Sequence, residues 1–74
     1  MVRAKFECYG MEKVKGYGDH PFHYNYRFGA VTSGSDENRS FFASTPSGEL
    51  KLQAVKADLF EVGKQYYIDF ELAG

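Results

Sequence analysis

Phe22-His23-Tyr24-Asn25-Tyr26-Arg27-Phe28 is the stretch that decides the fold, because aromatic and polar residues alternate through it without a break. Successive side chains of a β-strand point to opposite faces, so a period of two predicts a strand. One face carries the four aromatic rings, and the other carries the three polar side chains between them. We interpret this stretch as the central strand of a small all-β domain, and we expect the strand to run to about Thr32.

The residues on either side of this stretch supply four more predicted strands. Alternation from Val2 to Cys8 predicts the first, which we expect to continue past a bulge or bend at Gly10. The third is predicted over residues 39–44, where Phe41 and Phe42 are adjacent, so one of the two rings should leave the core. The turn-type residues 45–48 precede the fourth strand, and clean alternation over residues 65–72 predicts the fifth.

Residues 49–60 can be interpreted in two ways. Leu50, Leu52 and Ala54 alternate with polar residues, which favours a strand, yet most of these residues are also good helix formers. We predict a strand to Ala54, because the preceding turn needs a partner strand, and a short helical turn over residues 56–60. Five strands with one helical turn before the last predict a small, curved barrel, either SH3-like or OB-like.

The length of 74 residues predicts a single domain over residues 1–74. A chain this short buries only about 60 % of its unfolded surface, so its stability is marginal. Cys8 is the only cysteine, which excludes an intrachain disulfide, and we interpret it as a small buried hydrophobe. With only two histidines, neither a structural metal nor a cofactor is predicted. We therefore expect the chain to self-associate into a homo-oligomer.

Charge and hydropathy limit the partners further. A net charge of −1 argues against a nucleic-acid binder that works by neutralising phosphates, although it leaves a single nucleotide open. No stretch is long and apolar enough to span a membrane. A lone thiol and the absence of an apolar signal core near the start predict a cytoplasmic protein, in the host cell cytoplasm if the protein is viral.

The loop over residues 15–21 carries an aromatic ring between two glycines and ends in His20-Pro21. It is either a plain surface loop or a flap that lays Tyr17 and His20 against a ligand. His20 and His23 are three positions apart around a proline, so a shared face is not assured. No catalytic triad order and no phosphate-binding glycine loop is present, so the sequence predicts no enzyme and no catalytic residues.

Two segments carry a resemblance. Thr45-Pro46-Ser47-Gly48-Glu49-Leu50 and the stretch from Phe60 to Phe70 are similar to a group of very small proteins encoded in bacteriophage genomes. Those proteins also tend to begin with a short basic start like that of residues 2–6. The matching residues belong to predicted turns and strands, so the resemblance indicates the fold and not the function. It implies a viral origin and an accessory role, with no catalytic residues to carry over.

The tyrosine-rich composition, with six Tyr and seven Phe, suits a binding surface. We predict a non-enzymatic protein that binds or sequesters a nucleotide-type ligand, such as a signal of host defence, through aromatic rings and arginine. The alternatives are a barrel that binds single-stranded nucleic acid, and a protein-binding inhibitor or structural phage component. The candidate ligand residues are Tyr17, His20, His23, Tyr24, Tyr26, Arg27, Arg39 and Phe42. Six residues are expected in the core instead, namely Phe6, Phe22, Phe28, Tyr66, Ile68 and Phe70.

Overall fold

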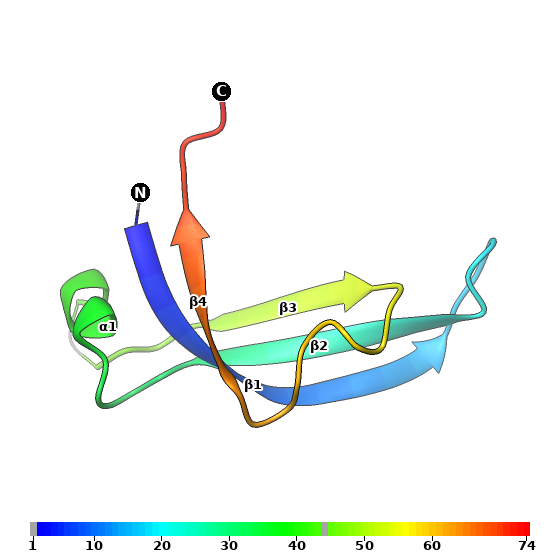
Figure 1. Cartoon of the computed structure of the whole chain (residues 1–74), viewed down its shortest axis with the longest axis horizontal. Coiled ribbons are helices and arrows are strands. Elements are labelled where there is room, and N and C mark those ends of the chain that lie inside the picture. Colours follow the sequence, from blue (N-terminus) through cyan, green and yellow to red (C-terminus); the bar gives the residue numbers. More distant parts are fainter. Residues whose placement is uncertain (1, 44) are drawn as a thin grey trace.

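The computed structural model describes residues 2–43 and 45–74, whose strands form one antiparallel sheet (Figure 1). The strands are β1 (Val2–Lys15), β2 (Phe22–Ala30), β3 (Glu49–Ala54) and β4 (Gln65–Phe70). Their order across the sheet is β3-β2-β1-β4. The prediction of a β-rich fold is confirmed. The expected closed barrel is not formed by the described residues, because the sheet is open, with β3 and β4 at its two edges.

The bulge expected at Gly10 is present in β1. Cys8 pairs with Phe28 and Gly10 pairs with Arg27, so Tyr9 is an extra residue opposite no partner. After an extra residue in one strand, the positions whose side chains point to a given face change from even to odd numbers, or the reverse. As a result the core face of the sheet takes even-numbered residues of β1 up to Cys8 and odd-numbered residues from Met11 onward. We call the opposite side, which carries Arg27, the outer face.

The predicted third strand over residues 39–44 is wrong where the structure describes it, and Ser44 itself lies outside the described residues. Residues Asp36–Phe41 form a short helix, α1. Ser35 caps its N-terminus by accepting a hydrogen bond from the backbone N–H of Asn38, and Asp36 and Glu37 lie in the first turn, where acidic side chains stabilise a helix. In the described part of the chain, no helix is long and apolar enough to cross a membrane.

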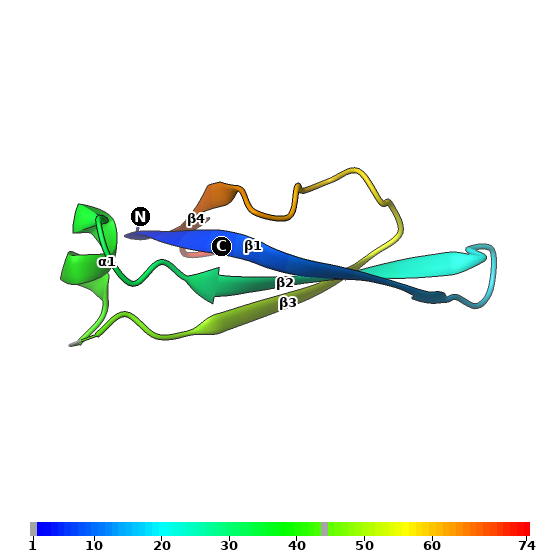
Figure 2. The ribbon, with the colours of Figure 1, turned by 90° about the horizontal axis from the view of Figure 1, so that it is seen from below.

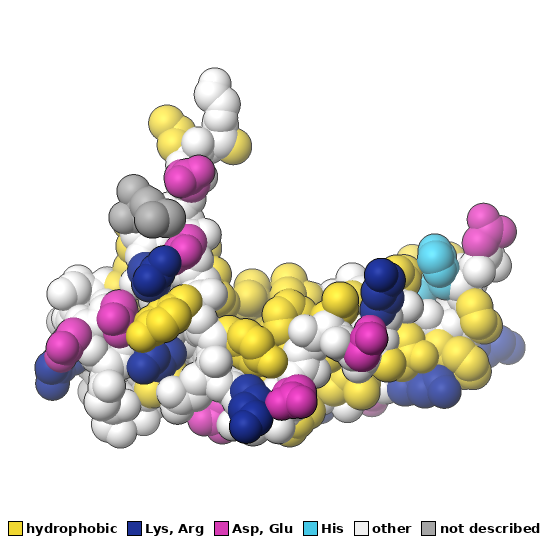
Figure 3. Space-filling view, viewed as in Figure 1, with side chains coloured by type: hydrophobic (Ala, Val, Ile, Leu, Met, Phe, Trp, Pro, Cys, Tyr) yellow, Lys and Arg dark blue, Asp and Glu magenta, His cyan; other side chains and the backbone are white. Residues whose placement is uncertain are grey.

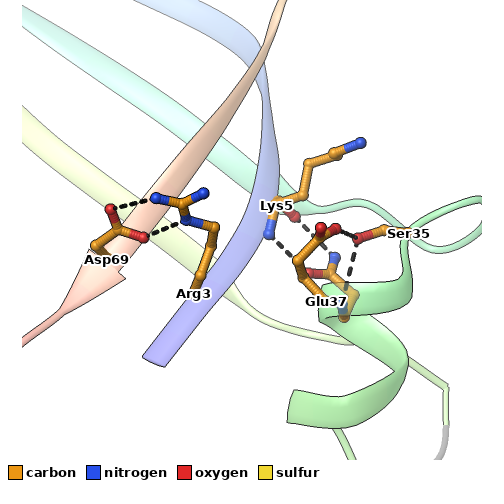
Figure 4. Close-up of polar contacts among 6 residues, drawn as sticks. Arg3, Lys5, Ser35, Glu37 and Asp69 are labelled. Atoms are coloured by element: carbon orange, nitrogen blue, oxygen red, sulfur yellow. Dashed lines mark hydrogen bonds and ion pairs between the residues drawn. The ribbon is translucent and has the colours of Figure 1, made fainter. Parts of the chain in front are cut away.

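Asn38 joins α1 to β1. Its fully buried amide accepts a hydrogen bond from the backbone N–H of Lys5 at 2.6 Å and donates to the carbonyl oxygens of Lys5 and Val31, each at 2.8 Å. The side chain therefore pairs with Lys5 as a strand residue would, just past the end of β2 at Ala30. Figure 4 shows α1 next to Lys5 of β1, and beside them the Arg3–Asp69 ion pair, which links β1 to β4.

The segment between β3 and β4, residues 55–64, passes over the core face of the sheet (Figure 2). We call it the crossing segment. The predicted helical turn over residues 56–60 is wrong, because tyrosine hydroxyls satisfy the backbone groups that a helix would pair internally. The Tyr26 hydroxyl donates to the Lys56 carbonyl at 2.7 Å and accepts from the N–H of Leu59, while the Tyr66 hydroxyl accepts from the N–H of Glu61.

The core lies between the sheet and this segment. Ala4, Phe6, Cys8, Tyr26 and Phe28 are buried. Phe60 belongs to the crossing segment and packs edge-on against three rings of the core. The centroid of its ring lies 5.0 Å from that of Phe28, 5.2 Å from that of Tyr26 and 5.3 Å from that of Tyr66.

The core prediction holds for some of the six residues and fails for two. Phe6 and Phe28 are buried, and Tyr66 and Ile68 are partly buried against them. Phe22 and Phe70 are 41 % and 50 % exposed, because β2 and β4 extend beyond the part of the sheet that the crossing segment covers.

Candidate ligand-binding surface

The eight predicted ligand residues do not form one site. Tyr17, His20 and His23 lie at the hairpin end of the sheet, and Arg39 and Phe42 lie at the opposite end, in and beside α1 (Figure 1). Tyr24 and Tyr26 lie on the core face, and Arg27 lies on the outer face, because side chains alternate along β2. Any ligand contact must therefore be built around a subset of them.

The hairpin loop is closed on itself. The N–H of Gly16 donates to the carbonyl of Pro21 at 2.8 Å, and a Cβ at Gly16 would lie 2.3 Å from the carbonyl oxygen of His20, so glycine is required there. The Tyr17 ring packs edge-on against His23 at 4.6 Å. His23 is thereby buried, in contrast to the ligand role expected for it, while Tyr17 remains 74 % exposed.

Tyr26 belongs to the core instead of a ligand site. Its ring is fully buried, and its hydroxyl is occupied by the backbone of the crossing segment. A base cannot stack on a ring that has no exposed face, so in this structure Tyr26 is not placed to contact a ligand. Tyr24, two positions away on the same face, is partly buried against this core.

At the helix end, Arg39 is paired with Asp36 of its own helix. Phe42 packs toward the core, with its ring centroid 6.4 Å from that of Phe6. Phe41 is the exposed member of the pair and lies parallel to Phe70, with centroids 6.1 Å apart. The prediction that one of these two adjacent rings leaves the core is thus confirmed, although the residues form a helix end and not a strand.

Arg27 lies in an open depression on the outer face, which we call the polar groove. Its volume is about 320 Å³. The Arg27 side chain lies across β1 at Gly10, where a Cβ would be 3.3 Å from two guanidinium nitrogens, so the missing side chain of Gly10 makes room for it. Among the described residues Arg27 forms no ion pair. The groove is lined by Glu12, Asn25, Arg27, Lys51, Leu52 and Gln53.

A second depression, which we call the turn groove, lies on the same face and has a volume of about 360 Å³. Tyr9, the bulge residue, lines it and is half exposed. Its ring carbons lie 3.5 Å from the position of a Cβ at Gly29, which therefore lets the ring lie flat on β2. The other lining residues are Glu7, Gly29, Ala30, Val31, Thr32, Ser33 and Gln65.

Tyr9 connects the two grooves electrostatically. Desolvation raises the pKa of its hydroxyl above the ordinary value, and so does the negative charge of Glu49, whose carboxylate oxygen accepts a hydrogen bond from the hydroxyl at 3.3 Å. The nearby positive charge of Arg27 acts in the opposite direction on the same pKa. An aromatic ring, a guanidinium and the Lys51 ammonium thus share one open face of the sheet.

Sequence reasoning found Arg27 but did not select Tyr9, Lys51, Asn25 or Gln53. Asn25 lies on the same polar face of its strand as Arg27, and the register of β2 with β3 brings Gln53 and Lys51 beside them. The signal for Tyr9 was Gly10, since a glycine inside a strand marks a bulge that re-aims a side chain.

Within residues 2–43 and 45–74, no group of three or more His, Cys, Asp and Glu side chains is placed to hold a metal ion. Comparisons with protein families, with curated proteins and with solved structures give no match. The resemblance to small phage proteins therefore stays a prediction.

Proposed function

We propose that this protein is a non-enzymatic binding protein that holds a nucleotide-type ligand on the outer face of its sheet. The observation that carries the proposal is Arg27, an arginine laid flat across Gly10 in a groove, with no ion-pair partner among the described residues. A guanidinium fixed in this way offers a fork of donors that matches a phosphate.

Lys51 supports the phosphate end of the proposed site. It is directly opposite Arg27 in the β2–β3 register and lines the same groove. The amides of Asn25 and Gln53 add neutral donors and acceptors, and Glu12 is the one carboxylate in the lining. The Lys51 ammonium also lies 3.8 Å from the Glu49 carboxylate, so Arg27 is the groove cation that has no ion pair among the described residues. One such cation in a chain whose net charge is −1 favours one bound phosphate over a long polyanion.

The turn groove supports the base end. A base can stack on the half-exposed ring of Tyr9, and such stacking contributes about 1–3 kcal/mol. Gln65 and Glu7 supply the hydrogen-bonding groups that read a base edge. Binding without conversion withdraws a ligand from solution, which is the accessory role that the resemblance to phage proteins implies.

The test is a thermal-shift and calorimetric screen with mononucleotides, cyclic dinucleotides and short oligonucleotides. We expect mononucleotides or cyclic dinucleotides to raise the melting temperature, because a ligand that binds only the folded state stabilises it. Tighter binding of oligonucleotides that weakens steeply with salt would favour the single-stranded nucleic-acid alternative instead. If no nucleotide of any kind raises the melting temperature, the proposal fails.

Arg27→Ala has a matched control in Arg39→Ala, since both are exposed arginines on regular elements, Arg27 in β2 and Arg39 in α1. Loss of a charge-assisted contact worth about 1.5–3 kcal/mol should weaken the nucleotide by roughly 10- to 100-fold in Arg27→Ala. Arg39→Ala should bind as the unaltered protein does. Equal affinities of the two variants would remove the polar groove from the proposal.

A further inference from the structure

The molecule exposes more surface than a compact chain of its size. Its accessible surface is 5489 Å², whereas a folded monomer of 8.4 kDa has about 4,600 Å². Its radius of gyration is 14.2 Å, compared with about 11 Å for a compact domain of this length. The excess of about 900 Å² is close to the roughly 800 Å² that each partner loses in a stable interface of standard size.

Much of the exposed apolar surface lies on the core face, beyond the part that Phe60 covers. Met11 and Leu52 flank the buried Tyr26 from the two neighbouring strands, and Phe22 lies farther along the same face of β2. Val55 and Leu59 lie beside them in the crossing segment, whose backbone is held by the Tyr26 hydroxyl. We call these five residues the apolar platform; their exposed fractions run from 37 % to 48 %. Figure 3, viewed onto the crossing segment, shows hydrophobic side chains along this part of the sheet.

We propose that the apolar platform is the interface of a two-fold symmetric dimer, in which the core faces of two copies of this chain pack against each other. A sheet that is apolar on one face reaches a stable arrangement by burying that face against a second layer. Here the crossing segment supplies only part of that layer, and a second copy supplies the rest. The excess surface is large enough for one interface of standard size, which is the area that a stable dimer of two copies needs.

Charge supports one orientation of the two copies. Lys13 lies at the hairpin end of the platform, with its ammonium 4.0 Å from the centre of the Phe22 ring. Asp58 lies in the crossing segment, next to Leu59. A two-fold axis that sets the hairpin of one copy over the crossing segment of the other brings Lys13 toward the Asp58 carboxylate of the second chain. Each of these contacts then occurs twice, as a self-complementary interface requires.

The dimer leaves Arg27 and Tyr9 free, because both lie on the side of the sheet away from the platform. Of the five platform residues only Leu52 also lines the polar groove, so the dimer does not depend on a nucleotide being bound. Failure of the dimer and failure of the proposed function are therefore separate outcomes.

The test is the mass in solution, measured by sedimentation equilibrium over a concentration series from about 1 to 200 µM. We expect a dimer with twice the chain mass of 8.4 kDa. Leu59→Asp should raise the dissociation constant at least about tenfold, because a carboxylate would be buried in the interface. The matched control is Leu72→Asp, which places the same charge at a 97 % exposed leucine beyond β4 and should leave the mass unchanged.

Leu59 is 47 % exposed in the single chain, so the variant should keep the circular dichroism spectrum of the unaltered protein. A monomer throughout the concentration series overturns the proposal. A dimer that dissociates with Leu72→Asp but not with Leu59→Asp also overturns it, because the interface would then lie elsewhere. Lys13→Glu and Asp58→Lys should each weaken the dimer, and the double variant should restore it; a double variant as weak as the singles refutes the orientation.

Discussion

Replacing Asn38 by alanine is the sharpest test of how the helix is attached to the sheet. The substitution removes three side-chain hydrogen bonds and leaves the N–H and carbonyl of Lys5 and the carbonyl of Val31 without those partners. At about 1 kcal/mol net for each bond, the expected loss is about 3 kcal/mol. A domain of 74 residues is stable by roughly 4–11 kcal/mol, so this one amide accounts for a large share of the total.

For a domain of this size, about 3 kcal/mol corresponds to a fall in melting temperature of roughly 12–24 °C, which calorimetry measures directly. Asn38→Asp is a discriminating companion, because it keeps the shape and the acceptor for Lys5 but turns both donors into a charge facing two carbonyls. It should be at least as destabilising as alanine. A melting temperature for Asn38→Ala within about 3 °C of the unaltered protein, or a stable Asn38→Asp, would refute the reasoning.

Two further predictions concern stability. Tyr26→Phe should lower the melting temperature by roughly 8–16 °C, because it removes both hydrogen bonds to the crossing segment at about 1 kcal/mol each. Tyr24→Phe, on the same face, should change it far less, and equal effects of the two variants would contradict the role given to the Tyr26 hydroxyl. The Arg3 guanidinium donates two hydrogen bonds to Asp69 and holds the pKa of that carboxyl below its ordinary value. A depressed folded-state pKa contributes stability that is present above the unfolded pKa and is lost as the pH falls through the folded value. Asp69→Asn should therefore melt at a lower temperature than the unaltered protein from pH 7 down to about pH 4, and the difference should shrink as the pH falls further through the lowered folded-state pKa. A difference that persists at the lowest pH at which both proteins stay folded would count against the ion pair.

The strands that alternate most clearly could be predicted from the sequence, because alternation reports directly on which face is buried. Residues 22–28 and 65–70 are such cases, and so is the first strand with its bulge at Gly10. The error at residues 39–44 came from giving weight to two adjacent phenylalanines. The local signal for a helix, Ser35 followed by Asp36 and Glu37, lies just upstream of these residues.

The rest depended on contacts between distant residues. Nothing local in residues 55–60 indicates that the Tyr26 hydroxyl, about thirty positions away, satisfies their backbone and so replaces a helix. Prediction of the candidate site from the sequence also failed where the site depends on contacts between distant residues. Alternation separated Arg27 from the core tyrosines, but only the register of β2 with β3 placed Lys51 opposite it. The grouping of residues into grooves is a property of strand pairing, which a single strand does not encode.

The bulge at Tyr9 gives the chain one position whose identity is independent of strand pairing. Cys8 and Gly10 pair with two consecutive residues of β2, so the ladder closes around Tyr9 without using it. An exchange of this side chain is therefore expected to leave Cys8 and Gly10 with their partners in β2. The group presented to a ligand at position 9 can then be changed without changing the pairing that folds the sheet.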